Sequence, residues 1–180
     1  MSISLLKNLR ELNLRYNELT DLPASIGSLT NLHVLDCSTN KLTKLPSEIG
    51  KLTSLERLSW DNRNNGLVNA SLGSILYATP IAGQMRSLTF LSRDGSSVSD
   101  STVASIGANQ KDLKFLSLMG APAGASLGSA GQVANVQPLA SLAHLQVLRL
   151  DNNNISDIQD LAGMRVVDNG EVATTKGNFV

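Results

Sequence analysis

Leucine recurs with a period of 23 residues over the first third of this chain. Three sets of apolar positions follow that step: Leu9, Leu32 and Leu55; Leu12, Leu35 and Leu58; Leu14, Cys37 and Trp60. A fixed period of about 20–29 residues indicates stacked structural units instead of a single globular fold. Because stacked units present an extended surface, the repeat points to binding before it points to chemistry.

Composition narrows the alternatives. The 180 residues include 15 basic and 15 acidic side chains, and a neutral chain has no general attraction to nucleic acid or anionic membranes. We find no run of about 18 apolar residues and no secretory signal, so we expect no membrane insertion. The single cysteine, Cys37, excludes an internal disulfide framework and favours a reducing compartment. We therefore expect a cytoplasmic protein, with an extracellular or cell-surface location as the alternative.

One repeat unit predicts a short strand, a turn and a return segment. The alternation from Glu11 to Arg15 is typical of a strand whose leucines face inward. Asn17 follows, and its amide group suits backbone groups that a turn leaves unpaired. Pro23 ends the strand pairing, and residues 24–29 return as a loop or short helical turn. Because one unit cannot bury its own apolar face, we expect the units to stack with their strands parallel.

The segments that carry this pattern are LRELNLRYNELTDLPASIGSLTN and LHVLDCSTNKLTKLPSEIGKLTS. They resemble the intracellular, 23-residue subtype of the leucine-rich repeat family. The resemblance implies an α/β fold: a right-handed solenoid, or horseshoe, with a parallel sheet on the concave face and loops or short helices on the convex face. It also implies that a partner protein binds the concave face.

A second repeat phase, with a step of 22 residues, occupies the C-terminal part. The segments VANVQPLASLAH and ISDIQDLAGMRV resemble the units of bacterial internalin-type surface proteins. We predict one leucine-rich-repeat domain over residues 1–180, whose ends fit a piece of a longer repeat array. Its parts are regular repeats at 1–62, irregular repeats at 63–120, a Gly/Ala-rich insertion at 120–131, regular repeats at 132–167 and a degenerate tail at 168–180.

The middle of the chain departs from the pattern. Trp60 is too large for an inward leucine position, which predicts either a displaced neighbour or a shifted strand. Arg93 at the equivalent position would bury an unpaired charge, which makes the register between 62 and 110 doubtful. Residues 64–87 are expected to hold a degenerate unit. The segment SVSDSTVASIGANQKD has apolar residues spaced for a short helix.

The sequence shows no catalytic constellation. His33 and His144 each stand alone beside a strand, and with one cysteine they form no zinc set. Residues 151–160 lack the glycine and glutamate spacing of a calcium loop. The Gly-rich segment GAPAGASLG lacks the lysine of a phosphate-binding loop. We therefore expect no enzymatic activity, no metal and no cofactor.

Strand residues between the inward leucines should face the concave surface, because side chains alternate along a strand. Phe90, Phe115 and Met119 would lie close together there and form the best hot-spot candidate. The full set of expected partner-binding residues is Arg15, Asp36, Arg57, Asp61, Phe90, Phe115, Met119, Arg149 and Asp151. The alternative is that the two phenylalanines turn inward in a shifted register.

The leading hypothesis is a non-enzymatic scaffold or protein-interaction module that binds a partner protein on a rigid, preformed face. Nucleic acid and membrane are not expected as partners. One alternative is the recognition part of a larger enzyme, a kinase or a ubiquitin ligase. The other is a bacterial-surface or secreted adhesin, which the 22-residue units favour.

Overall fold

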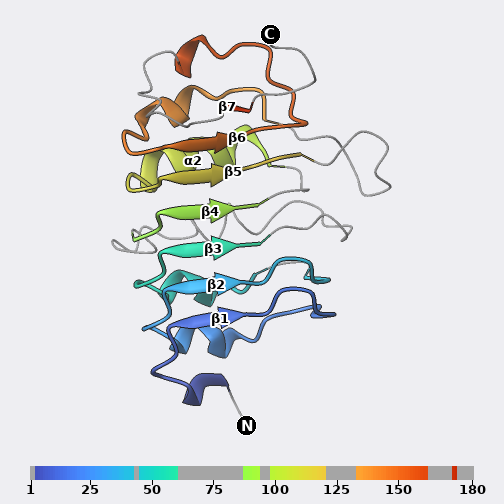
Figure 1. The fold of residues 1–180 in the computed structure, drawn as a ribbon, viewed down its shortest axis with the longest axis vertical. Coiled ribbons are helices and arrows are strands. Elements are labelled where there is room, and N and C mark those ends of the chain that lie inside the picture. Colours follow the sequence, from blue (N-terminus) through green and yellow to red (C-terminus); the bar gives the residue numbers. More distant parts are fainter. Residues whose placement is uncertain are drawn as a thin grey trace.

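The computed structural model describes residues 3–42, 45–60, 87–93, 98–120, 133–161 and 172–173. Nearly all of the expected degenerate unit, Gly/Ala-rich insertion and tail lie outside these residues. Within them, the chain forms coils that are stacked in chain order along one axis (Figure 1).

In the described residues, seven parallel strands form one sheet, in the chain order that stacked repeats predict. They are β1 (Glu11–Asn13), β2 (Val34–Asp36), β3 (Arg57–Ser59), β4 (Phe90–Ser92), β5 (Phe115–Ser117), β6 (Val147–Arg149) and the two-residue β7 (Val172–Ala173). Each of the first six strands has a leucine at its centre, and these leucines pair with one another across the sheet. The outward residues on either side of each leucine therefore also form continuous rows.

The strand register is continuous through the irregular middle of the chain. Arg57 pairs with Phe90, and Phe90 pairs with Phe115, although the coils between them differ in length. The alternative of a shifted register around Arg93 is therefore wrong for the described residues. The Arg93 N–H donates to the carbonyl of Ser117 at 2.8 Å, and such main-chain bonds hold the strand in place independently of the side chain.

The two unusual inward residues of the middle coils lie together. Trp60 is 3% exposed and Arg93 is 5% exposed, and the Arg93 Cζ lies 5.1 Å from the centre of the Trp60 ring. A guanidinium group stacks well on an indole because it is planar and weakly hydrated. The buried charge of Arg93 is therefore not unpaired, and Trp60 is accommodated without a shift of its strand.

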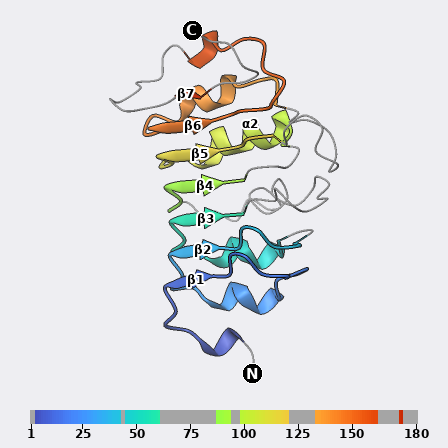
Figure 2. The same ribbon diagram turned by 45° about the vertical axis from the view of Figure 1, so that its right-hand side comes forward.

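The return segments lie behind the sheet and are mostly single 3-10 turns (Figure 2). They are η1 (Ile3–Leu5), η2 (Ala24–Ser28), η3 (Ser47–Lys51), α2 (Asp100–Asn109), η4 (Gln137–Ser141) and η5 (Gln159–Leu161). Pro23 and Pro46 are the N-cap residues of η2 and η3 and have an extended conformation. Their carbonyls accept the N–H groups of Ile26 and Ile49 at 2.9 and 3.1 Å, which are the first hydrogen bonds of these turns. The α2 helix confirms the helix expected there, and it buries Val103 and Ile106.

Glycines allow two pairs of return segments to touch. A Cβ atom added to Gly27 would lie 2.5 Å from the carbonyl oxygen of Glu48, and one added to Gly107 would lie 2.2 Å from that of Pro138. Both distances are shorter than any van der Waals contact, so a side chain at either position would push neighbouring coils apart.

A carboxylate links α2 to the following coil. Asp100 Oδ1 accepts hydrogen bonds from the backbone N–H groups of Ala134 and Asn135, at 2.8 and 2.9 Å. Hydrogen bonds to an ionised group are stronger than neutral ones. The negative charge also lies in the first turn of α2, where the helix dipole favours it.

The core is a column of aliphatic side chains that successive coils share. Leu35, Leu58 and Leu91 are each fully buried. The equivalent Leu12 is only half-buried, because no described strand lies on the N-terminal side of β1. Complete burial of a leucine side chain stabilises the fold by roughly 1.5–3 kcal/mol, so the column is the main source of stability.

Asparagine side chains stabilise the turns that follow the strands, as expected. Asn40 is 3% exposed, and its Oδ1 accepts the N–H of Leu19 at 3.1 Å. Its Nδ2 lies 2.8, 3.1 and 3.1 Å from the carbonyl oxygens of Leu14, Cys37 and Ser38. Asn153 makes equivalent contacts with the carbonyls of Leu118, Leu150 and Asp151. Because these bonds reach the preceding coil, each asparagine joins two repeats.

The residue before each asparagine has a left-handed backbone conformation. The φ angles are 59° at Tyr16, 54° at Thr39 and 56° at Asn152. Asparagine tolerates this conformation far better than tyrosine or a β-branched residue. The first two turns are therefore locally strained, and the turn at Asn152 is not.

Candidate protein-binding surface

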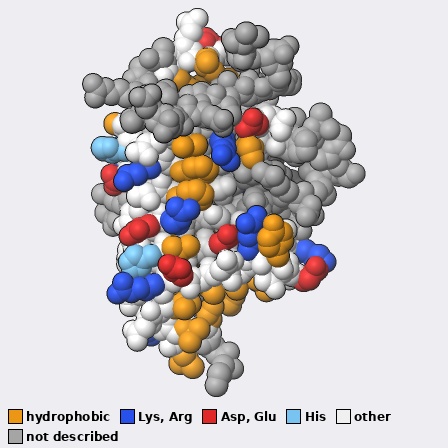
Figure 3. Space-filling model, in the orientation of Figure 1, with side chains coloured by type: hydrophobic (Ala, Val, Ile, Leu, Met, Phe, Trp, Pro, Cys, Tyr) orange, Lys and Arg blue, Asp and Glu red, His pale blue; other side chains and the backbone are white. Residues whose placement is uncertain are grey.

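The outward side chains of the strands form one surface, which we call the strand face. Figure 3 shows hydrophobic side chains in a vertical band over the strands, with basic side chains beside them. The first outward row consists of Glu11, Val34, Arg57, Phe90, Phe115 and Val147. Glu11 and Arg57 are exposed and the other four are half-buried. The phenylalanines thus lie on the outward side, and the alternative that they turn into the core does not apply.

The two phenylalanine rings stack on each other. The centres of the Phe90 and Phe115 rings are 4.2 Å apart, and the ring planes differ by 9°. The sheet imposes this arrangement, because Phe90 and Phe115 are directly paired on neighbouring strands about 4.8 Å apart. Parallel face-to-face stacking is not the geometry that two isolated rings prefer, since their electron-rich faces repel each other.

Two arginines cover the outer faces of the stacked rings. The Arg57 Cζ lies 4.1 Å from the centre of the Phe90 ring, and the Arg149 Cζ lies 5.5 Å from that of the Phe115 ring. A cation over a ring face is attracted to its electron density and contributes about 0.5–1 kcal/mol at an exposed site. The order Arg57, Phe90, Phe115, Arg149 forms what we call the Arg–Phe stack, which crosses β3 to β6.

The Arg–Phe stack carries two positive charges and contains no acidic side chain. Both arginines are exposed, and within the described ranges neither forms an ion pair with a carboxylate. The three-residue strands β3 to β6 contain these two arginines and no acidic residue. A guanidinium that stacks on a ring still presents its N–H groups along its own plane. The surface therefore offers unused hydrogen-bond donors beside apolar rings.

The other expected binding residues lie around the Arg–Phe stack or apart from it. Met119 and Asp151 are half-buried and lie two residues beyond β5 and β6. Asp36 is half-buried at the end of β2, where its Oδ1 accepts the Ser38 N–H at 3.0 Å. Arg15 lies beyond β1 at the N-terminal end. Asp61 lies outside the described residues.

Sequence reasoning missed one exposed aromatic residue. Tyr16 is 71% exposed, and the Arg15 Cζ lies 4.6 Å from the centre of its ring. The repeat pattern gave no signal for it, because the position belongs to a turn and has no apolar counterpart in the next coils. It is separate from the Arg–Phe stack, which begins at β3.

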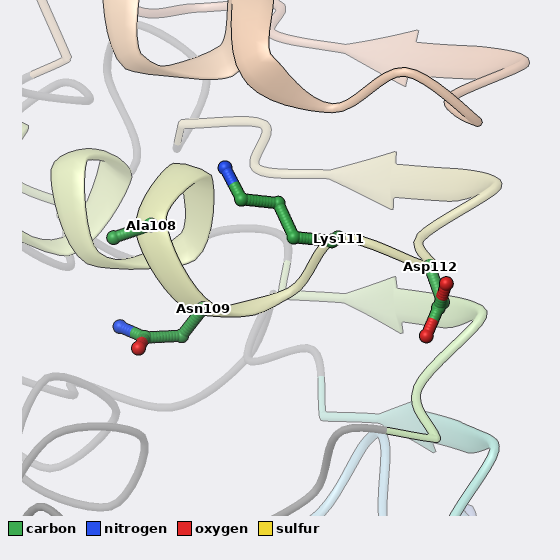
Figure 4. Close-up of a pocket in the computed structure, with 4 residues that line it drawn as sticks. All are labelled: Ala108, Asn109, Lys111 and Asp112. Atoms are coloured by element: carbon green, nitrogen blue, oxygen red, sulfur yellow. The ribbon is translucent and has the colours of Figure 1, made fainter.

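A hollow at the C-terminal end of α2 does not form a ligand site. It is lined by Ala108, Asn109, Lys111 and Asp112, and Figure 4 shows that the Lys111, Asn109 and Asp112 side chains point in different directions. Lys111 Nζ donates to the Gly107 carbonyl at 2.5 Å and to Ser141 Oγ at 2.9 Å. The charge of Lys111 is thus used to join α2 to η4.

The described part of the chain contains no other candidate site. Among those residues, no three His, Cys, Asp or Glu side chains gather in a group that could hold a metal ion. No helix within the same ranges is long and apolar enough to cross a membrane. The Arg–Phe stack is therefore the best-supported candidate for a functional surface.

Stacked parallel strands with an open, side-chain-lined face define a repeat solenoid. The chain belongs to the leucine-rich repeat family: a family model described as a leucine-rich repeat region matches residues 1–165. A comparison with curated protein sequences found no significant match.

Several solved structures share the fold. Internalin C2 from Listeria monocytogenes is 29% identical with a TM-score of 0.69, over 92% of this chain and 62% of that one. A leucine-rich-repeat protein from Leptospira interrogans is 30% identical with a TM-score of 0.67, over 90% of this chain and 37% of that one. Internalin F from L. monocytogenes is 22% identical with a TM-score of 0.67, and the match covers 96% of this chain and 50% of internalin F. The chain thus spans between about a third and two thirds of these proteins.

Proposed function

We propose that this protein is a non-enzymatic interaction module that binds a partner protein on the strand face. The observation that carries the proposal is the Arg–Phe stack, in which two half-buried rings and two exposed arginines lie side by side. Aromatic residues and arginine are the side chains that most often dominate binding energy at protein interfaces. Leucine-rich repeat domains in general bind proteins, which supports the same interpretation.

The stack is also well prepared for binding. The four side chains come from short strands that pair along one sheet, and the rings and guanidinium groups already restrict one another. A partner would meet an ordered surface, so little conformational entropy would be lost on association.

A capture experiment tests the proposal. The immobilised wild-type protein would be exposed to a lysate of its source organism, beside the double variant Phe115→Ala/Arg149→Ala and the control Lys51→Ala. Lys51 is exposed and lies in η3, behind the sheet. We expect a partner that the wild type and the control retain and that the double variant loses.

Two outcomes would contradict the proposal. Equal capture by the double variant would show that the strand face is not the interface. A collapse of its thermal midpoint would show that Phe115 serves the core. The single variant Arg149→Glu tests the same surface without removing a ring, because it reverses a charge that is exposed.

A second candidate function is recognition at a bacterial surface or after secretion. The identity of 29% with internalin C2 and the 22-residue units favour it. The single cysteine instead fits a reducing compartment, so a cytoplasmic location stays our first proposal. Fractionation of the source cells, followed by immunodetection, distinguishes the two locations. A catalytic domain elsewhere in a longer chain, as in a kinase or ubiquitin ligase, would be detected by sequencing the complete gene.

A further inference from the structure

We propose that the Arg–Phe stack recognises an acidic, extended segment of a partner protein. This inference rests on the proposed function, and it names the chemistry of what the strand face binds. The segment would carry two carboxylates that flank one apolar side chain.

Electrostatics favour a negatively charged partner at this place. Each ring has one face against the other ring and one face against a guanidinium group. The ring edges are therefore the parts left for a partner. The edge of an aromatic ring carries partial positive charge, and the adjacent guanidinium groups carry full positive charge. All the groups that a partner would meet in the stack are thus electropositive or apolar.

The arginines are suited to carboxylates in particular. A guanidinium group presents parallel N–H donors that match the two oxygens of a carboxylate. Within the described residues, Arg57 and Arg149 form no ion pair with a carboxylate. The neighbouring outward residues Ser59 and Ser92 are half-buried, and hydroxyl groups add donors without opposing charge.

The spacing of the arginines defines the segment. Arg57 and Arg149 lie three strands apart and two residues out of register. The distances of 4.1, 4.2 and 5.5 Å along the stack place their two Cζ atoms at most about 14 Å apart. An extended chain rises about 3.3 Å per residue, so two acidic residues about four positions apart would reach both arginines. The apolar side chain between them would rest on the edges of Phe90 and Phe115.

Single-stranded nucleic acid is the competing ligand, because aromatic side chains and arginines also bind it. Bases bind by stacking on an open ring face. In the Arg–Phe stack, no ring face is open, since Arg57 and Arg149 cover the outer ones. The chain also has no net positive charge, so it lacks the general attraction to phosphate that such binding requires.

Fluorescence anisotropy with three labelled probes tests the inference. The first probe is a Gly/Ser peptide of about 12 residues with two glutamates four positions apart and a leucine between them. The second has glutamine in place of each glutamate, and the third is an oligothymidylate of about 12 nucleotides. The proteins are the wild type, Arg57→Ala/Arg149→Ala, Arg57→Lys/Arg149→Lys and the control Lys51→Ala.

We expect the glutamate peptide to bind the wild type and Lys51→Ala alike. The glutamine peptide should bind the wild type about tenfold more weakly. The glutamate peptide should bind the alanine double variant about tenfold more weakly as well, since both changes remove a charged bidentate pair at each end. The lysine variant should fall between, because it keeps the charge and loses the planar fork.

Other results would overturn the inference. The inference is wrong if the wild type does not bind the glutamate peptide at millimolar protein concentration, or if it binds the two peptides equally. It is also wrong if the alanine double variant keeps the wild-type affinity for the glutamate peptide, or if the wild type binds the oligonucleotide more tightly. A different result distinguishes this inference from the proposed function. If capture of a partner requires Phe115 but neither arginine, the protein is an interaction module that does not recognise acidic segments.

Discussion

Replacement of Asn40 by alanine should lower the stability of the whole solenoid. Nδ2 of Asn40 has two hydrogens for three main-chain carbonyls, and its Oδ1 accepts one N–H, from Leu19. About three full hydrogen bonds are therefore lost, in a residue that is only 3% exposed. At roughly 1 kcal/mol for each net hydrogen bond, the free energy of unfolding should fall by about 3 kcal/mol. For a chain of this length, the Tm should fall by about 6–12 °C.

The equivalent residue of the first coil provides a matched control. Asn17 is exposed, and its Nδ2 donates to the carbonyls of Leu14 and Arg15, which water would satisfy after the substitution. Asn17→Ala should therefore cost less than about 1 kcal/mol. Urea unfolding followed by circular dichroism measures both variants. If the two substitutions lowered stability equally, burial would not be the cause, and the role assigned to the buried asparagines would be wrong.

Three further substitutions test other parts of the solenoid. Gly107→Ala should lower the free energy of unfolding by about 1–3 kcal/mol, because the new Cβ would meet the Pro138 carbonyl. The control Ala104→Gly, at an exposed position of the same helix, measures the gain in helix propensity that opposes this loss, about 1 kcal/mol; a higher Tm for Gly107→Ala would refute the contact. Asp100→Ala should lower the free energy of unfolding by about 2 kcal/mol, since two charged hydrogen bonds to the next coil are lost. Asp100→Asn keeps an acceptor oxygen and should lose less than half of that in urea unfolding; equal losses would show that the acceptor has no role. Tyr16→Asn should raise the free energy of unfolding by about 0.5–1 kcal/mol, because asparagine tolerates the φ of 59° at this exposed turn, and a lower Tm would show that the ring contributes more than the strain costs.

The amino-acid sequence carried most of the information about the regular coils. Leucines at most inward positions and an asparagine in the turn after the strand were enough to predict strand, turn and return segment in these coils. Each element is a local consequence of side-chain alternation and backbone hydrogen bonding. The expected face of Phe90 and Phe115 also agrees with their half-buried, paired positions. These predictions needed no knowledge of which coil packs against which.

The repeat predicted the register at Arg93 correctly, but it could not show how a charge is accommodated at this inward position. A charge at an inward position predicts a fault when it is considered alone. Its neighbour in space, Trp60, comes from another coil, and only the stacking of the coils brings the indole under the guanidinium group. The same is true of Gly107. A side chain is excluded at this position only because Pro138 of the next coil lies so close to it.

The repeat was sufficient to predict stacked units with a parallel sheet, since any chain that repeats an amphipathic unit must bury it against its copies. The family was indicated by the resemblance of whole repeat segments. The composition of the strand face was decided by the assembled sheet. Coils of different length place Arg57, Phe90, Phe115 and Arg149 on neighbouring strands. Their stacking depends on strand spacing and side-chain conformation across the sheet, and no local pattern encodes contacts between residues so far apart in the chain.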